Sequence, residues 1–218
     1  MNNLVIIGNG FDLAHGLKTS YTNFIENLID RAFAERHSSA KKLGRILSIP
    51  KGIRNKDEIW GEIHKVRLDT SNTLNTLNTL LILHHLLIRT HLKCWCDIER
   101  AYFDLLLSID SKGTIKYYDD VKKLNSDFLI IKQELDNYLS SQEVENCITG
   151  YETLLSYLCD YNSLVLNFNY TDTIERLYTN EVKSNRLVHI HGELKSDSNP
   201  MIFGFSANDS ESLNLVDK

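Results

Sequence analysis

Proline is scarce in this chain, with 2 among 218 residues, and no stretch rich in proline, glycine or serine interrupts it. Because such stretches commonly mark the linkers between domains, we expect a single domain over residues 1–218. Long apolar runs are also missing: Leu80–Ile88 is broken by two histidines and falls short of the ~20 residues that a membrane-spanning helix needs. The N-terminal residues lack the basic start and apolar core of a signal peptide. The sequence therefore predicts a cytoplasmic protein without a membrane partner.

An excess of basic residues is missing as well. The formal net charge is −5, so we expect no nucleic-acid partner, although the lysines and arginines between residues 41 and 56 leave a local basic patch open. The 4 cysteines include no Cys-x-x-Cys pair of the kind that binds zinc. We therefore predict no metal site, and the spacing leaves one alternative open, a site formed by Cys94, Cys96 and His91.

A glycine-containing turn follows the first apolar segment. The run Leu4–Ile7 ends at two glycines, Gly8 and Gly10, and amphipathic sequence follows. This order predicts a strand that turns tightly into a helix, as in nucleotide-binding α/β domains, where glycine lets a phosphate approach backbone N–H groups. The third glycine of the dinucleotide fingerprint would fall at Leu13 and is missing. The residues predicted to contact a nucleotide are Gly8, Asn9, Gly10, Phe11 and Asp12.

Helical periodicity dominates the next part of the chain. Apolar residues recur there at spacings of three and four, which place them on one face of a helix. An Asn-Thr-Leu triplet repeats three times from Asn72 and leads into the apolar stretch Leu81–Ile88. The sequence predicts helices over Thr19–Ser39, 73–91, 95–109, Tyr117–Tyr138 and Tyr151–Tyr161.

Strand-like segments return late in the sequence, and polar residues follow them. Ser163–Phe168 leads into Asn169-Tyr170-Thr171-Asp172, and Leu187–Ile190 leads into His191-Gly192-Glu193. Pro200–Gly204 is expected to be a fourth strand. Since ligands bind at the carboxyl ends of neighbouring parallel strands, we expect these polar groups and the glycine turn to meet at one edge of a sheet.

With these motifs, the sequence resembles the bacteriophage abortive-infection AbiH family. The resemblance lies in residues 4–17, 95–99, 167–171, 189–193 and 202–204. At longer range the three strand ends resemble those of the sirtuin-like NAD-binding fold. The resemblance implies an α/β fold with a Rossmann-like (sirtuin-like) parallel sheet and a large helical insertion between the first and second strands. It implies a nucleotide-binding core over residues 1–20 and 162–206 and a helical insertion over 40–161.

The resemblance also implies the roles of individual residues. Asn169 and His191 fall on the catalytic positions, and the five residues from Gly8 to Asp12 fall on the cofactor-binding turn, where Phe11 is expected to cover the nicotinamide ribose or ring. Asn9, Asp12 and Thr171 depart from the sirtuin pattern, and there is no four-cysteine zinc module. Two alternatives remain open: Asn169 caps the following helix, or His191 only bonds the turn at Gly192. We assign His189 a structural role.

The function implied is that of an anti-phage abortive-infection protein that cleaves NAD to nicotinamide and ADP-ribose. NAD is thus the expected ligand, as substrate. Two alternatives stay open: a non-catalytic sensor of NAD or ADP-ribose, and a hydrolase that acts on another nucleotide or on nucleic acid. Doubly wound domains usually have five or six strands, more than are recognised here. Two explanations stay open: a truncated copy that lacks C-terminal strands, or a compact member completed by oligomerisation. The partners considered are a second copy of the chain and a defence partner.

Overall fold

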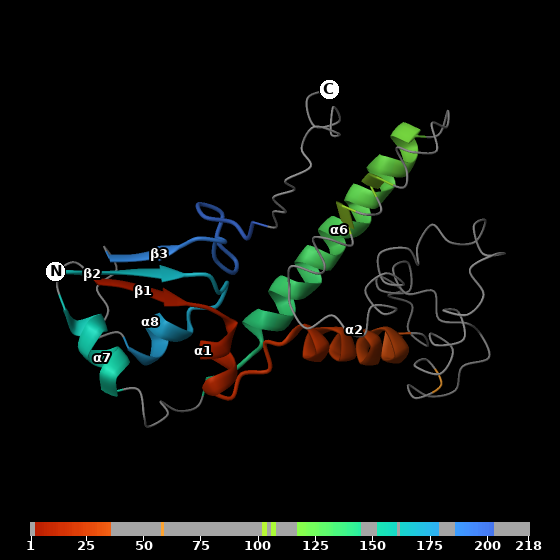
Figure 1. Cartoon of the computed structure of the whole chain (residues 1–218). Coiled ribbons are helices and arrows are strands. Elements are labelled where there is room, and N and C mark those ends of the chain that lie inside the picture. Colours follow the sequence, from red (N-terminus) through yellow and green to blue (C-terminus); the bar gives the residue numbers. More distant parts are fainter. Residues whose placement is uncertain are drawn as a thin grey trace.

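The computed structural model describes residues 3–35, 58, 102–103, 106–107, 117–144, 152–160, 162–178 and 186–202. In chain order the described elements are β1 (Asn3–Ile7), α1 (Asn9–Ala14), α2 (Tyr21–Glu35), α6 (Tyr117–Ser140), α7 (Glu152–Cys159), β2 (Ser163–Asn167), α8 (Thr173–Leu177) and β3 (Leu187–His189) (Figure 1). The helix predicted over 73–91 and most of the one predicted over 95–109 lie outside the described residues.

The described strands form a parallel sheet in the order β1-β2-β3. Ile7 lies opposite Asn167, and Asn167 lies opposite His189, so the last residues of all three strands are in register. The mixed α/β class with a parallel sheet is therefore confirmed for this part of the chain. The register also means that the segments after Ile7, Asn167 and His189 leave the sheet at the same edge.

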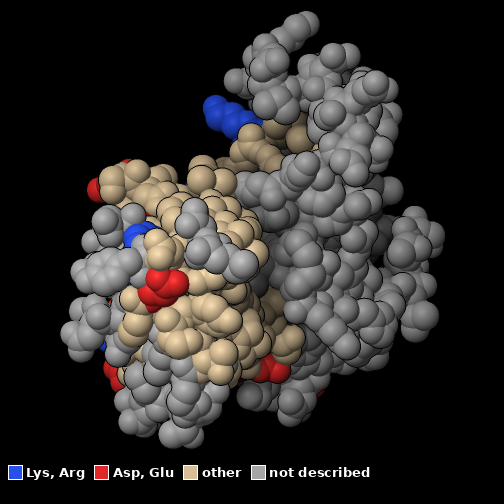
Figure 2. All heavy atoms as spheres, turned by 60° about the vertical axis from the view of Figure 1, so that its left-hand side comes forward, with Lys and Arg blue, Asp and Glu red and all other residues tan. Residues whose placement is uncertain are grey.

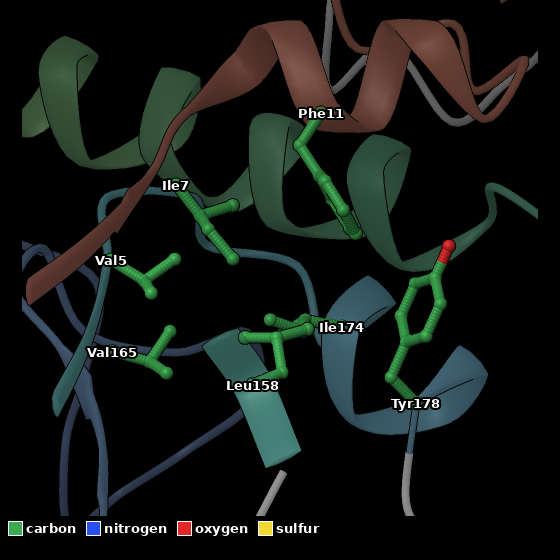
Figure 3. Packing of buried hydrophobic residues seen from close by; sticks show 7 residues of the cluster. All are labelled: Val5, Ile7, Phe11, Leu158, Val165, Ile174 and Tyr178. Atoms are coloured by element: carbon green, nitrogen blue, oxygen red, sulfur yellow. The ribbon is translucent and has the colours of Figure 1, made fainter. Parts of the chain in front are cut away.

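One face of the sheet is covered by helices, and the main core lies there. Figure 1 shows α1, α7 and α8 on the same side of the sheet. Val5 and Ile7 from β1 and Val165 from β2 point toward this layer and pack against Leu158 of α7 and Ile174 of α8 (Figure 3). Leu158 is 0% exposed, and Val165 and Ile174 are each 1% exposed. The alternation of side chains along each strand places these residues on one face.

The opposite face of the sheet is apolar and exposed. Leu4, Ile6, Leu164 and Val188 alternate with the buried residues, and each is more than two-fifths exposed. Both faces of β1 are therefore apolar, which explains why its sequence reads as a continuous hydrophobic run.

A second packing contact joins α2 to α6. Phe24 and Leu28 from α2 and Ile131 and Leu135 from α6 are each at most 1% exposed. Arg31 adds an ion pair with Glu134, with a nitrogen–oxygen distance of 2.6 Å. This contact holds the long helix α6 beside the segment that leads out of the glycine turn.

The helix boundaries follow the sequence closely. Residue Tyr21 begins α2, and the Ser20 hydroxyl accepts a hydrogen bond from the Asn23 N–H at 3.1 Å, which is an N-cap contact. Helix α6 extends two residues beyond the predicted Tyr138 end. The predicted strand at Pro200 is present only as an isolated parallel bridge between Pro200 and Glu193, within the residues described up to Ile202.

None of the described helices combines the length and apolarity needed to cross a membrane. On the face drawn in Figure 2, the Asp, Glu, Lys and Arg side chains of described residues are scattered and form no large patch of one sign.

Candidate functional site

The carboxyl edge of the sheet brings the predicted residues from β1 and β2 into direct contact. The Asn169 side chain donates from Nδ2 to the carbonyl oxygen of Gly8 at 3.1 Å. Backbone hydrogen bonds continue the sheet just past the strands: the Phe168 N–H donates to Ile7 at 2.8 Å, and the Ile190 N–H donates to Asn167 at 2.9 Å. Residues that are 161 positions apart in sequence are thereby joined at one edge.

The glycine turn has open space beside it. Gly8 is extended, with φ −138° and ψ −173°, and neither Gly8 nor Gly10 is among the glycines with positive φ. A Cβ atom built on either glycine would meet no heavy atom of the described residues within 4 Å. Backbone conformation and packing therefore do not require glycine at these two positions. Asn9 is fixed within the turn, because its Oδ1 accepts a hydrogen bond from the Thr19 hydroxyl at 2.7 Å.

Phe11 and Asp12 lie below the turn rather than on its surface. The Phe11 ring is 8% exposed and belongs to the core cluster, with ring-centroid distances of 4.3 Å to His15 and 5.9 Å to Tyr178 (Figure 3). In this conformation the ring faces the core, so contact between Phe11 and a ligand at the edge would involve its backbone. Its position beside the nicotinamide ribose stays a prediction.

Asp12 is a buried carboxyl group that links two of the strand ends. It is 1% exposed, and its Oδ2 accepts a hydrogen bond from the Thr171 hydroxyl at 2.5 Å. Its Oδ1 has no hydrogen-bond partner among the described residues. Burial raises the pKa of Asp12 above its ordinary value, while the hydroxyls of Thr171 and Thr173 and the nearby His15 oppose that rise. Such a carboxyl group can orient the turn above it and place negative charge beneath the edge.

Asn169 is held by its backbone and its side chain. It is 7% exposed, its N–H donates to Asn167 Oδ1 at 2.9 Å, and its side chain reaches Gly8. The N-cap of α8 is Asp172. The alternative that Asn169 caps this helix is therefore wrong, and its side chain bridges the ends of β2 and β1 instead.

His191 lies on the surface at the same edge. Its ring centroid is 5.3 Å from that of Phe168, in an edge-on arrangement, and 6.1 Å from that of Tyr170. Gly192, the next residue, has φ +79°, and a Cβ there would come within 2.2 Å of the Pro200 carbonyl oxygen. Glycine at 192 is thus required by the fold itself, unlike glycine at 8 and 10. His191 is placed by this turn and by two aromatic neighbours.

His189 has a charged partner that the sequence did not reveal. Its Nε2 lies 2.5 Å from Glu175 Oε1, and its Nδ1 lies 3.4 Å from the Asn169 carbonyl oxygen. Burial opposes protonation, but the hydrogen bond and the charge of Glu175, together with the charge of Glu193, raise the pKa of His189 above its ordinary value. His189 is the last residue of β3, and Glu175 lies in the first turn of α8. A polar residue at the end of a strand, close to the start of a helix, is the sequence signal that could have identified this pair.

Two cavities adjoin this region. The larger, about 840 Å³, lies between the α1–α2 connection and α6, with Lys18, Glu26, Asp30 and Glu143 among its lining residues. The smaller, about 340 Å³, lies beside the His189–Glu175 pair. The seven site residues predicted from sequence are not among the described residues that line either cavity. Among the described residues there is also no group of three or more His, Cys, Asp or Glu side chains that could hold a metal ion.

The fold and this edge define an α/β protein with a candidate ligand site where parallel strands end. Residues 4–217 match the family described as Bacteriophage abortive infection AbiH, so the chain belongs to the AbiH family. Membership of this family indicates a role in abortive-infection defence against bacteriophage. No curated protein and no solved structure was found to match the chain.

Proposed function

We propose that this protein acts in abortive infection by cleaving NAD to nicotinamide and ADP-ribose at the carboxyl edge of its sheet, within a sirtuin-like, Rossmann-like fold. The observation that carries the proposal is the open space beside Gly8 and Gly10, next to the Asn169 side chain. Glycine within a helix costs stability relative to alanine, by about 0.5–1 kcal/mol. The close approach of a diphosphate to the backbone would account for a glycine that the fold does not need.

The reaction places modest chemical demands on the protein. In NAD the nicotinamide is cationic, so when the C1′–N bond breaks it leaves with the bonding electron pair as a neutral molecule. Positive charge develops on the ribose, and water attacks C1′ to give ADP-ribose and a proton. The protein must stabilise the cationic sugar, place the water and accept that proton, as in other glycosidic cleavage.

The described residues can be matched to these demands. Backbone N–H groups from Gly8 to Phe11 would bind the diphosphate. The buried carboxyl of Asp12 lies beneath the turn, where negative charge favours a cationic sugar. Asn169 has a donor and an acceptor in one amide and would orient a ribose hydroxyl or the attacking water. His191 is exposed at the edge and would accept the proton.

The test is nicotinamide release from NAD by the purified chain and by two variants, Asn169→Ser and His191→Ala. We expect cleavage by the unaltered protein and a loss of at least about 100-fold in each variant, the range typical of general acid–base groups. Ser156→Ala on the exposed side of α7 serves as the matched control and should retain full activity. Equal NAD turnover in all four proteins would refute the proposed roles.

The alternative of a non-catalytic sensor uses the same edge. The observation that favours a sensor is the group of rings formed by His191, Phe168 and Tyr170. Such rings suit stacking against a ring of the ligand, which requires no bond to be broken. Calorimetry distinguishes the two functions: tight binding of NAD or ADP-ribose without nicotinamide release would establish the sensor. A separate titration with a nucleic acid at increasing salt concentration tests the nucleic-acid alternative, since such binding weakens steeply with salt.

A further inference from the structure

The smaller cavity is lined by none of the residues assigned to the proposed NAD site. Its volume of about 340 Å³ falls within the range of small-molecule sites, roughly 300–1,000 Å³. It opens where the segments after β2 and β3 approach the C-terminal end of α6. We call it the dyad cavity, and its charged lining residues are Asp172, Glu175, Arg176, His189, Glu193 and Lys195.

An ion pair between a buried histidine and a partly exposed glutamate lines the dyad cavity. The His189 side chain is 6% exposed and the Glu175 side chain 36%, and their nitrogen–oxygen distance is 2.5 Å. Both ring nitrogens of His189 face acceptors, Glu175 Oε1 and the Asn169 carbonyl, so the imidazolium form is favoured. Burying such a pair costs desolvation energy, and pairs of this kind in a cleft mark candidate functional sites.

The rim of the cavity carries exposed positive charge. Arg176 is 48% exposed on its side chain and lies 3.9 Å from Asp172, which is 66% exposed. Such an exposed pair is worth at most about 1 kcal/mol, so Arg176 can be recruited by a better partner. Lys195 is also exposed at the cavity. A planar guanidinium and an ammonium group at one rim suit a phosphate.

We propose that the dyad cavity binds a sugar phosphate, the ribosyl phosphate portion of a nucleotide or a free pentose phosphate. The sugar hydroxyls donate to the carboxylates of Glu175 and Glu193 inside the cavity, as an acidic residue binds ribose hydroxyls in dinucleotide-binding domains. The phosphate oxygens accept from Arg176 and Lys195 at the rim. The proposal thus assigns the carboxylates of Glu175 and Glu193 to the sugar and the exposed cations Arg176 and Lys195 to the phosphate. The proposal does not depend on NAD cleavage.

The experiment uses the full chain and three probes in separate titrations: D-ribose 5-phosphate, D-ribose and inorganic phosphate. Binding is followed by the ring resonances of His189 in nuclear magnetic resonance spectra, assigned with His189→Gln. We expect ribose 5-phosphate to shift these resonances and to bind at least about tenfold more tightly than either fragment. Glu175→Gln, Arg176→Gln and Lys195→Asn should each weaken binding about tenfold or more, since each removes a charge-assisted hydrogen bond.

The control is Ser156→Ala, which lies on the exposed side of α7 outside both sites and should leave ribose 5-phosphate binding unchanged. Lys195 has φ +52°, a conformation that asparagine tolerates, so Lys195→Asn tests the rim without threatening the fold. Three results would each overturn the proposal: no shift at about 10 mM probe, a concentration well above a Kd of about 1 mM; equal affinity for phosphate alone; or a loss of binding in Ser156→Ala as large as in the cavity variants. None of these results bears on NAD turnover, so the two proposals fail independently.

Discussion

Replacing Gly10 by alanine should make the protein more stable and less able to bind NAD. Gly10 is exposed, is the second residue of α1 and has no positive φ. The added methyl group would meet no described atom within 4 Å. Alanine in a helix is favoured over glycine by about 0.5–1 kcal/mol, so the free energy of unfolding should rise by about that amount. For a chain of this size the melting temperature should rise by about 1–4 °C.

The same methyl group should obstruct the ligand. If the diphosphate of NAD approaches the backbone at Gly10, the Cβ occupies space that the phosphate oxygens need, and binding should weaken by at least about tenfold, the effect of losing roughly 1.4 kcal/mol. Thermal unfolding followed by circular dichroism measures the first effect, and calorimetric titration with NAD measures the second. The prediction is therefore an opposite change in stability and in affinity from one substitution.

Gly16→Ala provides the matched control. A Cβ at Gly16 would also meet nothing within 4 Å, but Gly16 has φ +82°. Alanine in that left-handed conformation costs about 1–2 kcal/mol, so this variant should lose stability. If Gly10→Ala were destabilising like Gly16→Ala, or if it bound NAD as tightly as the unaltered chain, the assignment of the glycine turn to ligand binding would be refuted.

Two further predictions concern buried side chains. Folding raises the pKa of Asp12 above its ordinary 3.8, so the contribution of this carboxyl group to stability is complete below pH 3.8 and is lost as the pH rises through the folded-state pKa. Asp12→Asn should therefore have a higher free energy of unfolding than the unaltered chain at pH 7. Urea titrations should show that this difference shrinks toward acidic pH. A pH-independent difference would contradict this origin. Leu158→Ala should lower the free energy of unfolding by about 2–5 kcal/mol, because Leu158 is 0% exposed under the sheet. Leu164→Ala, on the exposed face, should change it far less, and equal losses in both would show that the faces are misassigned.

Much of the element order could be predicted because local signals agreed with the fold. The predicted strands at residues 4–7 and 163–168 and the predicted helix Tyr117–Tyr138 are all present, with ends that differ by at most two residues. The expected meeting of Gly8 with Asn169 followed from the rule that ligand-binding groups lie where parallel strands end, and the Asn169 side chain does donate to the Gly8 carbonyl oxygen.

Other features depend on neighbours that a sequence pattern does not contain. All four residues from Leu4 to Ile7 are apolar, so alternation could not tell the buried face from the exposed one. The Phe11 ring points into the core because Phe11 lies in the first turn of α1, which packs on the other residues of the core cluster. The pairing of His189 with Glu175 requires knowing that β3 lies beside β2 and its following helix, which is a matter of strand order. These contacts are set by tertiary packing, which local propensity does not specify.

The distance in sequence between β1 and β2 has a consequence for how the protein is made. Gly8 and Asn169 are separated by 161 residues, and closing such a loop costs roughly 4–5 kcal/mol of chain entropy before any contact compensates. At about 5–20 residues per second, a ribosome needs roughly 8–30 s to synthesise the intervening chain. The apolar strand β1 therefore cannot pair with β2 until β2 has left the ribosome. The candidate site at the carboxyl edge of the sheet therefore forms only after β2 and β3 have been translated.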